Sequence, residues 1–143
     1  MVPDKPVGKI DHVAVAVRSI ERAKVFFSEL LGTEFVEIGS DNDLGFRSVM
    51  SPNGLELLEP TRPDSDLARF LDKRGEGLYA IAFATSDADI SRRKAEEMGV
   101  RVVGDHAVNE EPIRGLREIW LHPKDSFGVY LMFTQGNPIT AGS

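Results

Sequence analysis

The sequence predicts an α+β fold in which two βαβββ modules form one cup-shaped, open barrel. Two pairs of similar segments support this prediction: residues 10–17 match residues 78–85, and residues 54–58 match residues 129–133. Each member of the first pair precedes a run with helical apolar spacing that ends at a glycine. A repeat of about 70 residues is too long for a solenoid unit, so we interpret it as a duplicated module.

We expect a single domain covering residues 1–143, a length that can bury one substantial core. The first module is predicted at about residues 9–60 and the second at about residues 77–135. A linker helix at about residues 64–74, with apolar residues at helical spacing, is expected to join them.

The first module begins with a strand at residues 9–17 in which valines face one way and His12, with small residues, faces the other. Ser19 is a suitable N-cap for the helix that follows, and Gly32 is a suitable left-handed residue after its end. Three strands are then predicted, at residues 34–38, 45–50 and 54–59, with Asn-Gly as a hairpin signal before the last.

The second module repeats this order. We expect a strand at 78–85, a helix at 88–98, a short strand at 100–103, a polar loop at 104–112, strands at 116–121 and 128–134, and a frayed tail at 136–143.

Composition narrows the class of protein. The net charge of −6 argues against binding to nucleic acid or to an anionic membrane, both of which favour a basic surface. No apolar run approaches the length of a membrane span. The chain has no cysteine, and its first residues lack the apolar core of a signal peptide, so we expect a cytoplasmic protein.

Glu56 is the most informative polar residue. It lies between Leu55 and Leu57, so it points away from two apolar neighbours and toward the predicted cup. A buried carboxylate needs a partner, and His12 is the expected one, with Arg47 as another. His12 and Glu56 are therefore the candidate catalytic residues; an interior ion pair that only maintains the cavity is the alternative.

Other residues are expected to line a ligand site. The repeat aligns Arg47 and Ser48 with Arg117 and Glu118, so the two arginines are candidates for binding a carboxylate or phosphate, with solvent-facing arginines as the alternative. The remaining predicted lining residues are Glu118, Met132, Tyr79 and Ala80. His122 is predicted to be structural, and His106 to be exposed in the loop.

Several segments resemble the vicinal oxygen chelate superfamily, and within it the methylmalonyl-CoA epimerase branch, with glyoxalase I as a relative. These segments are Ile10-Asp11-His12-Val13-Ala14, the helix ending in Leu31-Gly32, Gly75-Glu76-Gly77-Leu78, and His122-Pro123-Lys124 followed by Gly128-Val129. The similarity extends from about residue 9 to residue 135.

The resemblance implies a divalent metal inside the cup, bound by one residue from the first strand and one from the last strand of each module. Its ligand positions fall on His12, Glu56, Ala80 and Met132, and the position of a second base falls on Arg47. Ala80 has no ligand atom, and the Met132 thioether is a poor ligand for a hard cation. We therefore expect no cofactor; if a divalent metal is present, His12 and Glu56 are its expected ligands.

Three functions remain open from sequence. The first is an isomerase, epimerase or lyase that acts on a small carbonyl or carboxylate compound, such as an acyl-CoA, without the four-ligand metal site. The second is a binding protein that sequesters a ligand, as bleomycin-resistance relatives do. The third is a metal-dependent methylmalonyl-CoA epimerase that uses another ligand such as Glu118. We expect that epimerase activity to be absent or very weak, and we expect a homodimer.

Overall fold

The structure is a computed structural model that describes residues 5–141. Its elements, in chain order, are β1 (Val7–Ala16), α1 (Ile20–Leu31), β2 (Val36–Asp41), β3 (Phe46–Met50), β4 (Leu55–Pro60), α2 (Asp66–Arg74), β5 (Gly77–Thr85), α3 (Ala88–Glu97), β6 (Val102–Ala107), β7 (Arg117–Leu121), the short 3₁₀ helix η1 (Pro123–Asp125) and β8 (Tyr130–Gln135).

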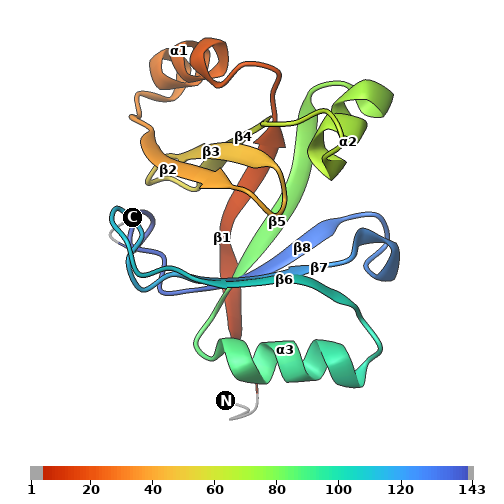
Figure 1. Ribbon diagram of the computed structural model, residues 1–143. Coiled ribbons are helices and arrows are strands. Elements are labelled where there is room, and N and C mark those ends of the chain that lie inside the picture. The colour runs from red at the N-terminus through yellow and green to blue at the C-terminus, as the bar shows by residue number, and fades with distance from the viewer. Residues whose placement is uncertain (1–4, 142–143) are drawn as a thin grey trace.

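One curled, half-barrel sheet of eight strands carries the fold, in the order β2-β3-β4-β1-β5-β8-β7-β6. β1 and β5 are antiparallel and run side by side through its middle, with β2–β4 on one side and β6–β8 on the other (Figure 1). Each module pairs its first strand in parallel with its last, β1 with β4 and β5 with β8. The predicted α+β, glyoxalase-like fold of two βαβββ modules is confirmed.

The strand register agrees with the sequence repeat. Ala14 lies opposite Glu56 in the first module, and Ala82 lies opposite Met132 in the second. His12 and Ala80 each stand two residues before these positions, so His12 is equivalent to Ala80 and Glu56 to Met132. On the next strands, Met50 pairs with Glu56 and Trp120 with Met132, which makes Ser48 equivalent to Glu118.

Helices α1 and α3 cover the convex face of the sheet, one on each module (Figure 1). Ile20 of α1 packs with Val49 and Leu57, and all three side chains are fully buried. The ends of α1 follow the sequence signals. The Ser19 hydroxyl accepts a hydrogen bond from the Arg22 backbone N–H, and Gly32 adopts a left-handed φ of 61°.

The concave face is filled at its centre by a cluster of apolar and aromatic side chains. Small residues of β1 and β5 leave space there for Trp120, Tyr130 and Met132. Helix α2 lies over one end of this cluster, where Leu67 and Leu71 are buried. A cavity beside this filled centre, lined by Glu56 and Glu118, contains the candidate site.

Two sequence predictions about the second module and the tail were wrong. The loop predicted at 104–112 contains most of β6, whose polar residues pair with β7 because an edge strand can leave one face to solvent. The tail is not frayed through residue 141: Asn137 is buried and donates hydrogen bonds to Asp11 and Met50. Residues 142 and 143 lie outside the described residues. No helix within residues 5–141 is long and apolar enough to cross a membrane.

The packing of α1 against the sheet predicts a contrast between two leucines. Leu57 is fully buried beneath α1, and Leu57→Ala should lower the free energy of unfolding by about 2–5 kcal/mol because it removes buried methyl groups and leaves a cavity. Leu30, on the exposed side of α1, is 65% exposed, and Leu30→Ala should change stability by less than about 0.5 kcal/mol. Urea unfolding followed by circular dichroism measures both, and equal effects would contradict the packing described.

Candidate active site

Three ionisable side chains meet at the concave side of the sheet, from β1, β4 and β7. The Nε2 atom of His12 lies 3.4 Å from Oε1 of Glu56 and 3.7 Å from Oε2 of Glu118. His12 and Glu56 are buried, and the Glu118 side chain is 19% exposed. None of these three atoms has a hydrogen-bond partner among the described residues. Buried polar atoms are normally paired, so these three unpaired atoms mark the candidate site.

Asp11 orients the His12 ring from its other side. His12 Nδ1 donates a hydrogen bond to Asp11 Oδ2 at 2.7 Å, which directs Nε2 at the two glutamates. Asn137 Nδ2 donates to the same oxygen at 2.8 Å, and the Thr140 hydroxyl donates to Oδ1 at 2.7 Å. Burial tends to raise the pKa of Asp11, but these hydrogen bonds outweigh it and hold the pKa below its usual value. Asp11 is therefore a stable anion behind the imidazole.

Ser48 holds Glu56 in place. Its hydroxyl donates a hydrogen bond to Glu56 Oε2 at 2.7 Å, and both residues are buried. The other carboxylate oxygen, Oε1, faces His12 and has no hydrogen-bond partner among the described residues.

The pKa values of His12 and Glu118 are both raised within this cluster. Burial alone would lower the pKa of His12, but the hydrogen bond to Asp11 and the carboxylates of Glu56 and Glu118 raise it to about 10. Burial, reinforced by the charge of Glu56, raises the pKa of Glu118 to about 8, although His12 opposes the shift. At neutral pH the cluster therefore contains a charged imidazole and a carboxyl group that retains its proton.

Arg47 and Arg117, predicted to bind ligand, do not face the cup. Arg47 Nη2 lies 2.7 Å from Oε1 of Glu37 and 3.3 Å from Oε1 of Glu21 on the convex face. Arg117 makes the equivalent ion pairs in the second module, with Asp105 and Asp89. Because side chains alternate along a strand, the inward residues are their neighbours Ser48 and Glu118. A second base on β3 would have to face inward, so its position is Ser48 and not Arg47.

The other predicted lining residues are apolar or lie elsewhere. Ala80 and Met132, at two of the ligand positions that the resemblance implies, are buried in the apolar cluster and offer no hard ligand atom. Tyr79 lies at the opposite end of the concave face, against Phe70 and Tyr130. His122 is structural as predicted, since its ring Nδ1 accepts a hydrogen bond from the Lys124 backbone N–H.

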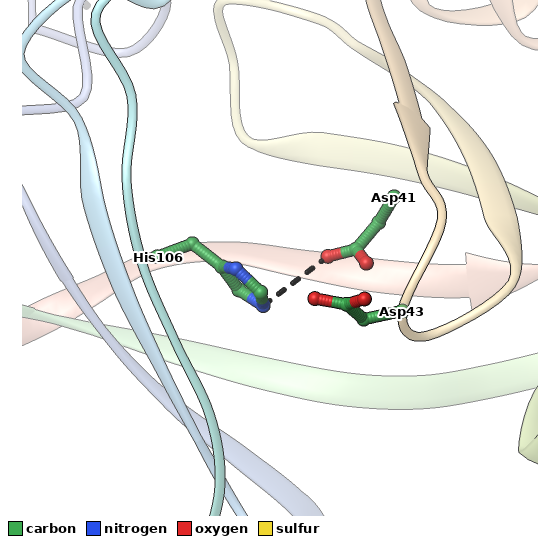
Figure 2. A group of neighbouring side chains, drawn as sticks. All are labelled: Asp41, Asp43 and His106. Carbon is green, nitrogen blue, oxygen red and sulfur yellow. Dashed lines mark ion pairs between the residues drawn. The ribbon is translucent and has the colours of Figure 1, made fainter.

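A cavity of about 630 Å³ opens above Glu56 and Glu118, and its lining includes a second polar group. Figure 2 shows Asp41 and Asp43 pointing toward His106, whose Nε2 lies 3.4 Å from Asp41 Oδ2. One ligand atom from each of the three residues lies within 4.8 Å of the others, an arrangement that could hold a metal ion. His106 is thus on β6 and partly buried, not exposed in a loop as predicted. The expected absence of a metal cofactor is not confirmed.

The sequence did not indicate the roles of Asp11, Asn137 and Thr140. Strict alternation places Asp11 and His12 on opposite faces of a strand, but the β1–β5 pairing shifts register between Ile10 and His12. Such an irregularity lets neighbouring side chains meet on one side. The adjacent Asp-His pair was the available signal for Asp11. No local sequence pattern links Asn137 and Thr140 to β1, because Asn137 is 126 positions from Asp11.

Comparison with known proteins identifies the superfamily of this fold. Residues 11–115 match the Glyoxalase/Bleomycin resistance protein/Dioxygenase superfamily. The match covers more than half of the chain, and the chain belongs to this superfamily.

Within the superfamily, the chain is similar to epimerases of acyl-CoA compounds. It is 32% identical over 136 residues to the ethylmalonyl-CoA/methylmalonyl-CoA epimerase of Cereibacter sphaeroides, covering 90% of this chain and 98% of that protein. A variant of the Streptomyces coelicolor methylmalonyl-CoA epimerase, solved with 2-nitronate-propionyl-CoA, superposes with a TM-score of 0.79 at 31% identity over 94% and 99% of the two chains. The Mycobacterium tuberculosis methylmalonyl-CoA epimerase gives a TM-score of 0.81 at 29% identity over 100% and 97%. The predicted resemblance is confirmed, and the chain is an acyl-CoA epimerase-like member of the superfamily.

The raised pKa values predict how stability depends on pH. The pKa of His12 rises from 6.5 to about 10 and that of Glu118 from 4.5 to about 8, so the folded protein binds more protons than the unfolded chain in these ranges. The stability that each group contributes is therefore complete below its unfolded pKa and is lost as the pH rises to its folded pKa. Both contributions decline between pH 6 and pH 9, so stability should fall over this interval. We expect the Tm to drop over this interval in buffer with EDTA, measured by circular dichroism.

Glu118→Gln removes one of the two proton-binding groups and should make this drop clearly smaller. Glu37→Gln, on the convex face and half exposed, is the matched control and should leave the slope unchanged. An identical slope in Glu118→Gln and in the unmodified protein would show that Glu118 does not hold a proton in the folded state.

Proposed function

We propose that this chain is an enzyme that transfers protons at the α-carbon of an acyl-CoA thioester, in an epimerisation that uses side-chain acids and bases. The observation that supports it is the pair of carboxylates, Glu56 and Glu118, that lie beside the imidazole of His12, together with the raised pKa of Glu118. Removal and return of a carbon-bound proton needs one group that is ready to accept and another that is ready to donate.

Glu56 is suited to remove the proton. Ser48 occupies one of its oxygens, so Oε1 is the atom that accepts the proton as the α-carbon–hydrogen bond breaks. The electron pair of that bond moves toward the thioester carbonyl and forms an enolate. The His12 Nε2 atom lies 3.4 Å from this oxygen, on the side of Glu56 that faces the cup.

Glu118 is suited to return a proton to carbon. Its raised pKa keeps the carboxyl group protonated near neutral pH. Glu118 belongs to the second module and lies beside the imidazole of His12, which belongs to the first. After the transfer Glu56 is protonated and Glu118 is charged. His12 Nε2 lies between the two, so it can give its proton to Glu118 and take the one on Glu56. This exchange restores the starting state without an external base.

The residues do not fit the four-ligand metal set that the resemblance implies. Ala80 and Met132 leave two of its four positions without a hard donor, and Glu118, from β7, adds one outside that set. The trio Asp41, Asp43 and His106 brings its ligand atoms within 4.8 Å of one another, but Asp43 is exposed and the trio lies around a different histidine. The proton transfers above therefore rest on the side chains alone.

An acyl-CoA thioester is the substrate class that the similar proteins favour. Their names include ethylmalonyl-CoA and methylmalonyl-CoA epimerase, and the Streptomyces coelicolor structure contains an acyl-CoA analogue. A CoA thioester with a second carbonyl on its α-carbon also has the acidic proton that a carboxylate base requires. The proposal does not specify which substituent the α-carbon carries. That epimerase activity on methylmalonyl-CoA itself is absent or very weak stays a prediction.

The proposed acid–base roles predict the rate of deuterium exchange at C2. We expect the protein, in ²H₂O, to exchange the C2 proton of at least one compound among methylmalonyl-CoA, ethylmalonyl-CoA and other 2-substituted malonyl-CoA thioesters. Loss of a general base or acid costs about 10²–10⁴-fold in rate, and Glu56→Gln and Glu118→Gln should each do so. Proton NMR of the thioester measures the exchange, and Glu37→Gln on the convex face is the control.

Two outcomes would contradict this function. Exchange that persists in Glu56→Gln would remove that residue from the role of base. Tight binding of these thioesters without exchange of any of them would favour the sequestering function that the sequence left open.

The missing ligand positions predict weak binding of a divalent cation at His12. Loss of a residue that only hydrogen-bonds to a metal ligand lowers metal affinity by about 10–100-fold. Ala80→His with Met132→Glu adds two direct ligands, so the double variant should bind Mn²⁺ more tightly by at least that factor. Isothermal titration and Mn²⁺ electron paramagnetic resonance measure it, in an Asp43→Asn background that weakens the second polar group. Tight binding without these substitutions, lost in Glu118→Gln, would instead show that His12, Glu56 and Glu118 form a metal site.

A further inference from the structure

The two edge strands of the sheet approach each other at a group of side chains that can ligate a metal. β2 and β6 are the outermost of the eight strands, one from each module. Asp41 ends β2, Asp43 lies in the turn to β3, and His106 lies on β6. Figure 2 shows the two carboxylates and the imidazole pointing toward one another. We call these three residues the edge cluster.

The edge cluster meets a spatial condition that the His12 site does not meet. Within residues 5–141 it is the single group of three or more His, Asp or Glu residues whose ligand atoms all lie within 4.8 Å of one another. His12, Glu56 and Glu118 form no such group. The site at the edge strands is therefore the better candidate for a metal ion.

The imidazole of the edge cluster has an unpaired nitrogen that faces the carboxylates. His106 Nε2 is buried and has no hydrogen-bond partner among the described residues. It lies 3.4 Å from Asp41 Oδ2, whereas a charge-assisted N–H···O bond measures about 2.7–2.9 Å. Gly104 leaves room for the ring, since a Cβ at that position would lie 3.2 Å from Nε2. Because buried polar atoms are normally paired, this nitrogen points to a ligand.

The spacing within the edge cluster fits two ligands of one zinc ion. Ligand atoms that bind Zn²⁺ tetrahedrally at about 2.0–2.1 Å lie about 3.4 Å from each other. This is the separation of His106 Nε2 and Asp41 Oδ2. Asp43 is exposed, so its side chain can turn to bring the third ligand atom to the ion. A water molecule then completes the four ligands, as it does in other sites with three protein ligands.

Neighbouring groups direct the carboxylates without neutralising them. The Leu44 backbone N–H donates a hydrogen bond to Asp41 Oδ1 at 2.8 Å, which leaves Oδ2 toward His106. Arg62 donates to two backbone carbonyls of the same turn, at 2.6 and 3.0 Å, and its side chain pairs with Asp64. The arginine therefore fixes the turn and forms no ion pair with the edge cluster.

The cavity beside the edge cluster is strongly acidic. Its lining includes six carboxylates, two of them from the edge cluster, and no lysine or arginine of the described residues. A cavity lined by charges of one sign concentrates ions of the opposite sign. Carboxylate oxygens and an imidazole nitrogen are both ordinary zinc ligands. The charge of the cavity and the type of ligand atom thus agree on a divalent cation.

We propose that Asp41, Asp43 and His106 bind a zinc ion that links the two edges of the curled sheet. The site is separate from the ligand positions that the resemblance implies, which fall on β1, β4, β5 and β8. The ion holds the first module to the second at the rim of the cavity above Glu56 and Glu118. It takes no part in the proton transfers, so this inference does not depend on the proposed function.

Zinc binding to the metal-free protein tests the edge cluster. After treatment with EDTA and its removal, we expect isothermal titration in about 0.15 M salt to show one Zn²⁺ site, and the Tm to rise when Zn²⁺ is added. Asp43→Asn removes a ligand from an exposed position and should weaken binding by at least about tenfold and reduce the rise in Tm. Of the three histidines, His106 should be the one whose imidazole proton signals shift with Zn²⁺.

The matched control is Glu110→Gln, which removes one charge from an exposed residue that lines the same cavity outside the edge cluster. It should change the affinity by less than about threefold, because its charge is largely screened at this salt concentration. The Tm of each metal-free variant checks that the fold is retained.

Three results would overturn the edge cluster as a zinc site. Equal losses in Asp43→Asn and Glu110→Gln would show only a diffuse attraction of cations to the acidic cavity. Binding that is retained in Asp43→Asn and lost in Glu118→Gln would place the ion at His12. Absence of Zn²⁺ binding to the unmodified protein would leave His106 and Asp41 as an ion pair.

Discussion

The burial of one imidazole among three carboxylates is the constraint on which the site depends. His12 is only 1% exposed; its Nδ1 is hydrogen-bonded to Asp11, and its Nε2 faces Glu56 and Glu118 at 3.4 and 3.7 Å. A buried charge that loses its partner destabilises a protein by about 3–5 kcal/mol. The four groups therefore have to be considered as one unit whose members fix one another's charge and position.

The duplicated fold makes this unit asymmetric. Equivalent positions of the two modules carry His12 and Ala80, Glu56 and Met132, and Ser48 and Glu118. The first module contributes an imidazole and a carboxylate, and the second contributes one carboxylate and the apolar wall. Two identical halves would place like charges across the central strands at close range. The apolar residues Ala80 and Met132 in the second half carry no such charge and form a buried wall beside the acidic groups.

Much of this could be predicted from sequence because a duplicated strand pattern fixes both fold and register. Period-two alternation was enough to direct His12 and Glu56 to the concave face, and the repeat aligned Glu118 with Ser48. The sequence pattern placed Arg47 and Arg117 on the wrong face. Both faces of β3 and β7 carry polar side chains, so alternation alone does not show which face is directed into the cup. It also failed for Asp11, where a shift in strand register overrides alternation, and for His106, which belongs to an edge strand without an apolar pattern.

The hydrogen bonds from Asn137 and Thr140 to Asp11 join the two ends of the described chain at the site. The charge on Asp11, and through it the orientation of His12, is set by residues that a ribosome adds only after the whole sheet has been made. A nascent or proteolytically shortened chain can complete its eight strands and still lack a correctly oriented imidazole. The orientation of the imidazole therefore depends on residues that lie outside the sheet itself.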